Sequence, residues 1–266
     1  MKNLKKYRSL LNSEVQGLFL TSRYSRMYAA EFDIAEGFAI VSAKGARYYT
    51  DGRYIESAQN NIKDFEVIEF NAEHPLFTLL YLAVGEFNSY RERLHADFVP
   101  MTAQINAFRA SKEPWELDRM VKAQEITDKA FAEVCTRIHE GMSEKELCAE
   151  LIYCLYKNGA EGLSFDPIVV SGPNTSMPHG VPGERKLQKG DFITMDFGVL
   201  YQGYCSDMTR TVALGYATDE MKKVYYTVLE AQLAGIAASK AGVSGQTVDA
   251  AARKVITDAG YGSYFT

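Results

Sequence analysis

The first third of the chain alternates short apolar runs with stretches whose apolar residues recur at helical spacing. Runs rich in Ile, Val, Tyr and Phe between turn residues favour strands, and the longer periodic stretches favour helices. We expect strands at residues 17–21, 37–42, 47–50 and 65–70, and helices at 2–13, 54–61 and 75–84. Alternating elements of this size predict a small α/β domain with a hydrophobic core of its own.

Beyond residue 114 the spacing becomes that of longer helices. Apolar residues close to the helical period predict one helix at 115–137 that Gly141 ends, and Ser143 with Glu146 has capping-box spacing. We expect further helices at 144–158, 219–240 and 247–259, and strands at 165–171, 191–199 and 204–214. This change predicts a boundary between residues 109 and 115, with one domain at 1–110 and a second at 111–266.

Composition and charge exclude several classes of protein. The 266 residues are 47% hydrophobic and 24% charged, as in an ordinary globular protein, and the net charge of −5 is spread along the chain. No basic stripe predicts a nucleic-acid partner, and apolar runs as short as residues 77–84 cannot span a membrane. Charged and polar residues interrupt the apolar stretch that a signal peptide needs, so we expect a cytoplasmic protein.

The four cysteines show no CxxC spacing, which argues against a zinc ribbon or a disulfide framework. Buried, reduced thiols that pack as small hydrophobic groups fit the pattern better. We expect this of Cys135, Cys148, Cys154 and Cys205.

Residues 191–214 carry the pattern that points to chemistry. Side chains alternate faces along a strand, so Ile193 and its alternate neighbours form a packing face, while the opposite face is small and polar. A hairpin centred between Tyr201 and Gln202 would set Asp196 opposite Asp207. Opposed like charges destabilise a sheet pair, so these acids call for a cation, most simply a divalent metal with oxygen ligands. On spacing alone, a solvent-exposed hairpin whose acids only confer solubility fits equally well.

The same residues resemble the signature of the "pita-bread" metallopeptidases, with Asp196 in MDFG and Asp207 in SDMTRT. The segment SFDPIVVSGPNTSMPHG at 164–180 resembles the strand and loop that deliver a histidine, here His179, to the substrate in that family. Residues 1–110, with TDGRY at 50–54, resemble the amino-terminal domain of its creatinase, prolidase and aminopeptidase P branch. The resemblance implies an α/β (α+β) chain, with an antiparallel sheet flanked by helices in the second domain.

That resemblance also implies an activity, namely hydrolysis of the bond between an amino-terminal residue and proline. Asp196 and Asp207 would be ligands of two divalent ions, Mn²⁺ in the first place and Co²⁺ or Zn²⁺ as alternatives. His179 would be catalytic, through a hydrogen bond to the scissile carbonyl. The implied partners are a proline-containing peptide and, in the complete enzyme, a second copy of the chain.

The family's ligand set needs a further histidine and two glutamates, which we expect beyond Thr266. The chain as given is therefore expected to be an incomplete version without useful peptidase activity. The rival hypothesis is a metal-free relative that acts as a protein- or nucleic-acid-binding module. The presence of Asp196, Asp207 and His179 favours the enzyme, and the two acids also argue against a creatinase, which does not use them.

Overall fold

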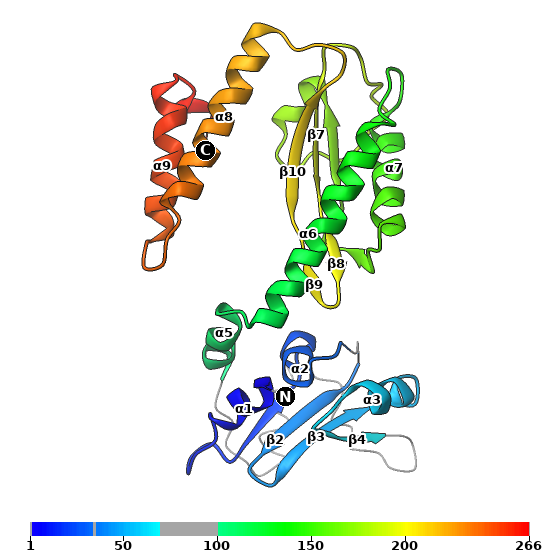
Figure 1. Ribbon diagram of the computed structural model, residues 1–266, viewed down its shortest axis with the longest axis vertical. Coiled ribbons are helices and arrows are strands. Elements are labelled where there is room, and N and C mark those ends of the chain that lie inside the picture. The colour runs from blue at the N-terminus through cyan, green and yellow to red at the C-terminus, as the bar shows by residue number, and fades with distance from the viewer. Residues whose placement is uncertain (1, 34–35, 70–100, 266) are drawn as a thin grey trace. The chain divides into compact units, whose positions relative to one another are not determined.

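The structure of the chain is a computed structural model that describes residues 2–33, 36–69 and 101–265 (Figure 1). The chain folds into two compact units, each built from separate stretches of sequence. The first unit comprises Met1–Thr127, Gly159–Ser164 and Gly198–Ser206, and the second comprises Asp128–Asn158, Phe165–Phe197 and Asp207–Thr266. The expected mixed α/β class is confirmed, while the boundary after residue 110 stays a prediction.

The first unit contains a four-stranded sheet in the order β1-β2-β3-β4. Strands β1, β2 and β3 are antiparallel, and β4 runs parallel to β3. The strands are Gly17–Leu20, Phe38–Ser42, Gly45–Thr50 and Glu66–Glu69, and the helices before and after them are α1 (Lys2–Arg8), α2 (Arg23–Ala30) and α3 (Ile55–Asn61). Their core includes Tyr7, Tyr28, Val41, Tyr48 and Ile105. All four predicted strands are therefore confirmed to within a few residues.

The helices of this part of the chain differ from the prediction in two ways, and one predicted helix is not described. The first helix ends at Arg8 instead of continuing to residue 13; residues 9–10 form a turn, and the Asn12 side chain accepts from the Glu14 and Val15 amides in the bend that follows. Helix α2 and helix α5 (Thr102–Ala110) were not expected. The helix predicted at 75–84 lies outside the described residues.

The first unit also contains a small sheet in the order β5-β8-β9. Its strands are Gly162–Leu163, Val199–Tyr201 and Tyr204–Cys205. Gln202 and Gly203 connect β8 to β9, and both have positive φ, at 46° and 80°. Positive φ at both central residues defines a type I′ turn, whose twist suits a two-residue hairpin.

This turn corrects the hairpin centre expected from the sequence. Tyr201 pairs with Tyr204, so the centre lies between Gln202 and Gly203, one residue later than predicted. A Cβ at Gly203 would meet only the flexible Met27 side chain, which can move, so the positive φ is the main reason for glycine at this position. Cys205 follows the turn and is exposed, which corrects its expected burial.

The second unit is built on an antiparallel sheet in the order β10-β7-β6, with strands Met208–Ala213, Phe192–Phe197 and Ile168–Ser171. Ile193, Met195 and Phe197 are fully buried, which confirms the predicted packing face. Phe131, near the end of helix α6 (Pro114–Cys135), stacks on Phe197 with ring centroids 6.2 Å apart.

Three more helices complete the second unit. Helix α7 (Glu144–Lys157) packs beside β6 and begins with the predicted capping box of Ser143 and Glu146. Helices α8 (Asp219–Ala238) and α9 (Gly245–Asp258) lie side by side (Figure 1). In the parts of the chain that the structure describes, no helix has the length and apolar character needed to cross a bilayer.

Candidate active site

Strands β7 and β10 carry the polar face on which the site was predicted. Asp196 is paired with Thr209, whose hydroxyl donates a hydrogen bond to Asp196 Oδ1 at 2.8 Å. Asp207 comes directly before β10 and so lies two positions before Thr209. The expectation that Asp196 and Asp207 are directly opposed is therefore wrong, because the turn lies one residue later than the sequence suggested.

The two carboxylates suit a hard divalent cation. Asp196 is half-buried and Asp207 is exposed, and no ion pair joins either acid to a described Lys, Arg or His. Thr209 engages one oxygen of Asp196, which leaves Oδ2 and the Asp207 carboxylate as donors of the type that Mn²⁺ prefers. Among the described residues no three His, Cys, Asp or Glu side chains form a metal-binding group. Metal ligation by this pair stays a prediction.

His179 lies in the loop that follows β6. The loop begins with a 3₁₀ helix, Gly172–Ser176, and His179 itself is exposed. Gly180 is buried, and a Cβ there would come within 2.7 Å of Val170, so this glycine lets the loop fold back on β6. No described group is hydrogen-bonded to the His179 ring, and its catalytic role stays a prediction.

A buried polar network next to this loop escaped the sequence analysis. Arg185 donates to both oxygens of Asp191, at 2.6 and 2.9 Å, and to Ser171 Oγ at 2.6 Å. Ser171 Oγ in turn donates to Glu144 Oε1 at 2.8 Å. The capping box accounts for Glu146 but gives no sign of Glu144, whose partners are far away in sequence.

The network shifts the pKa of both acids in the same direction. Burial would raise the pKa of Glu144, but hydrogen bonds from Gly183, Ser171 and Asn174 outweigh it and lower the value. Burial likewise opposes ionisation of Asp191, and the Arg185 guanidinium overcomes it, so its pKa also lies below the ordinary range. Both groups are therefore carboxylates at neutral pH.

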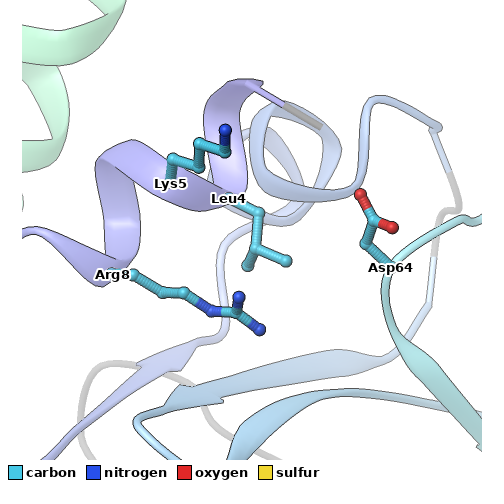
Figure 2. A pocket seen from close by; sticks show the side chains of 4 residues that line it. All are labelled: Leu4, Lys5, Arg8 and Asp64. Atoms are coloured by element: carbon cyan, nitrogen blue, oxygen red, sulfur yellow. The ribbon is translucent and has the colours of Figure 1, made fainter.

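The first unit contains a pocket whose lining residues are distant in sequence from the residues described above. Leu4, Lys5, Arg8 and Asp64 line it, from helix α1 and the turn that precedes β4 (Figure 2). It contains two cations and one acid but none of the predicted site residues. We assign it no role in catalysis.

Comparison with known proteins gives consistent matches. The profile of metallopeptidase family M24 matches residues 118–266, and that of the creatinase/prolidase N-terminal domain matches residues 4–111. A Bacillus subtilis protein named "Uncharacterized peptidase YqhT" is 35% identical over 98% of this chain and 79% of its own length. The Xaa-Pro dipeptidase of Pyrococcus furiosus is 32% identical over 86% of this chain and 69% of its own. The solved structure of the Xaa-Pro dipeptidase from Bacillus anthracis has 35% identity and a TM-score of 0.87, over 99% of this chain and 79% of that one.

Proposed function

Since the chain belongs to metallopeptidase family M24, in the branch with a creatinase/prolidase N-terminal domain, we propose that it carries part of the active site of an Xaa-Pro peptidase. The reaction is hydrolysis of the bond between an amino-terminal residue and proline. One observation carries the proposal: the family match includes the paired strands β7 and β10. Thr209 of β10 is hydrogen-bonded to Asp196 of β7, and Asp207 lies two positions before Thr209.

In this proposal Asp196 and Asp207 hold two divalent ions, with Mn²⁺ preferred over Co²⁺ or Zn²⁺. Such ions, when bound, lower the pKa of a water molecule and polarise the substrate carbonyl. The Thr209 hydroxyl fixes Asp196 in one orientation. A ring nitrogen of His179 donates a hydrogen bond to the carbonyl oxygen, where negative charge develops during attack.

The ligand set is incomplete in the sequence as given. The chain spans 79% of the Bacillus subtilis relative and 69% of the Pyrococcus furiosus one. We infer that a histidine and two glutamates outside this sequence complete the metal site, and that the complete enzyme is a homodimer. Two carboxylates alone bind Mn²⁺ weakly, because Mn²⁺ stands low in the affinity series of divalent ions.

The test compares two proteins in Mn²⁺ titrations and in cleavage of an Xaa-Pro dipeptide. One is the 266-residue chain, and the other is extended with the segment of the Bacillus subtilis relative that this chain does not cover. We expect cleavage by the extended protein only. There, Asp207→Asn should reduce activity by orders of magnitude, while Asp258→Asn, which changes an exposed acid of α9, should not.

Three outcomes would contradict parts of the proposal. Equal cleavage by both proteins would show that the missing ligands are assigned wrongly. An Asp207→Asn variant as active as its parent would remove the metal mechanism. Absence of both Mn²⁺ binding and cleavage would leave the metal-free binding module as the better account.

A further inference from the structure

Glu144 is a fully buried acid that the proposed reaction does not use. It is the first residue of helix α7 and lies next to residues 183–187, where Lys186 forms an isolated bridge with Ser143. Acids are almost never fully buried unless they are paired or hydrogen-bonded. The partners of this carboxylate therefore indicate what it does.

Four hydrogen bonds converge on the Glu144 carboxylate. Oε1 accepts from the Ser171 amide and hydroxyl, both at 2.8 Å, and from Asn174 Nδ2 at 3.0 Å. Oε2 accepts from the Gly183 amide at 3.0 Å. Ser171 and Asn174 stand at the beginning of the loop and Gly183 at its end, so one carboxylate ties both ends together.

The segment between these ties carries His179. Its own hydrogen bonds are local: the Met177 amide bonds to Asn174 O and the Gly180 amide to Met177 O, both at 3.1 Å. These bonds shape the loop internally, and the buried Gly180 packs against Val170 of β6. The hydrogen bonds that join the loop to helix α7, by contrast, lie at its ends.

Backbone pairing supports the end near Gly183 as well. The Glu144 amide donates to Arg185 O and the Lys145 amide to Gly183 O, both at 3.1 Å. A Cβ at Gly183 would lie 3.4 Å from Glu144 Oε2, so the carboxylate is in close contact with the backbone that it holds. Helix α7 thus begins on the segment where the loop ends.

We propose that Glu144 is a positioning residue for His179: its carboxylate fixes both ends of the loop and so sets where the imidazole meets the substrate. The inference rests on the role proposed above for His179. It adds a group outside the metal ligands, one whose two carboxylate oxygens are both used.

The key variant is Glu144→Gln, which keeps the size of the side chain. A glutamine has one acceptor oxygen and one NH₂ group, and the NH₂ group cannot accept from an amide. Either the Ser171 amide or the Gly183 amide must therefore lose its hydrogen bond to this side chain, whichever way the amide turns. Glu146→Gln is the matched control, because Glu146 lies in the same helical turn but holds Ser143 and Lys186 and is 59% exposed.

The first measurement is hydrogen–deuterium exchange of the 266-residue chain, which needs no peptidase activity. In Glu144→Gln, exchange at the Ser171 or the Gly183 amide should rise about tenfold or more, as expected when a hydrogen bond to a charged group is lost. Glu146→Gln should leave both amides unchanged. Asn174→Ala removes one of the four bonds and should give a smaller rise at residues 172–177, even if Glu144→Gln fails to fold.

The second measurement is the kinetics of the extended protein on an Xaa-Pro dipeptide. A displaced His179 weakens an interaction made in the transition state, so kcat should fall about a hundredfold with little change in KM. Unchanged exchange in Glu144→Gln would overturn the anchoring, and raised exchange with unchanged kcat would overturn the positioning role. If the extended protein without substitutions does not cleave the substrate, the proposed function fails. The exchange result still decides whether Glu144 anchors the loop.

Discussion

Removing the Tyr204 hydroxyl should destabilise the first unit measurably. This hydroxyl donates to Glu116 Oε1 at 2.8 Å, and Glu116 is only 2% exposed. The other oxygen of Glu116 accepts from the Glu113 amide at 2.8 Å. Tyr204→Phe keeps the ring and its edge-on contact with Trp115, at a centroid distance of 5.8 Å, so the variant isolates the hydrogen bond.

The size of the effect follows from the charge and burial of the acceptor. Hydrogen bonds to charged groups contribute about 1.5–3 kcal/mol to the free energy of unfolding, and an acceptor left without its partner in the interior is costly. With a urea dependence of about 2 kcal/mol per molar, the unfolding midpoint should fall by about 1 M. Burial and the Glu116 carboxylate also raise the pKa of Tyr204, so the hydroxyl stays a donor at neutral and mildly basic pH.

Trp115 provides the assay, because it is the only tryptophan in the chain and belongs to the first unit. Its fluorescence during urea unfolding reports on this unit even if the second unit unfolds separately. Tyr201→Phe is the control: it makes the same chemical change on the paired strand, where the hydroxyl has only a 3.3 Å bond from the exposed Gln202 side chain. It should shift the free energy by less than about 0.5 kcal/mol.

Two results would refute this reasoning. Equal effects of Tyr204→Phe and Tyr201→Phe would show that the buried acceptor is irrelevant. A double-mutant cycle gives the second test, since Tyr204→Phe should cost less when Glu116 is already glutamine. If the two changes are simply additive, the hydrogen bond does not couple these residues.

Three further predictions concern other parts of the fold. Ser206→Ala should lower the free energy of unfolding by about 1–3 kcal/mol in the same fluorescence assay, because the buried Ser206 hydroxyl accepts from the Val199 amide at 3.0 Å. An unchanged free energy of unfolding would rule out a contribution from this bond. Gly203→Ala should lower the free energy of unfolding by about 1–2 kcal/mol, because Gly203 has a positive φ. Gly45→Ala should leave it nearly unchanged, because a Cβ at Gly45 would contact no other atom. Because the pKa of Asp191 is lowered in the folded state, its stabilising effect is present at neutral pH and lost below about pH 4. In acid titrations followed by circular dichroism, Asp191→Asn should therefore be less stable at pH 7 and lose less stability on acidification; parallel curves would contradict this.

The sheet faces could be predicted from the sequence because their signal is local. Alternation along residues 192–197 determines which side chains are buried, and Ile193, Met195 and Phe197 are all fully buried. Helix α2 was missed although the similarly short α3 was predicted, so length alone does not explain the difference. The stability of helix α2 comes from distant contacts, such as the Tyr28 hydroxyl bonded to Phe108 O.

The hairpin register could not be fixed in the same way. It depends on Gln202 adopting a positive φ, which is uncommon for a residue other than glycine and leaves no mark in the sequence. Spacing indicated Asp196 and Asp207 as candidates, and the family resemblance added His179; the roles of all three stay predictions. Glu144 was missed because its partners lie 27 to 39 residues away, at distances in sequence where only the folded chain brings them together.

The alternation of the two units along the chain has a consequence for the protein's modularity. The polypeptide passes from one unit to the other five times, after residues 127, 158, 164, 197 and 206. A single cut after residue 158, 164 or 197 divides both units, whereas a cut after 127 divides only the first unit and a cut after 206 only the second. Neither unit can therefore be expressed as one uninterrupted fragment that is free of residues from the other. Recombination within residues 127–206 would divide at least one unit. Insertions are better tolerated in surface loops. Each unit is compact in itself, yet no stretch of sequence that encodes a whole unit is free of residues from the other.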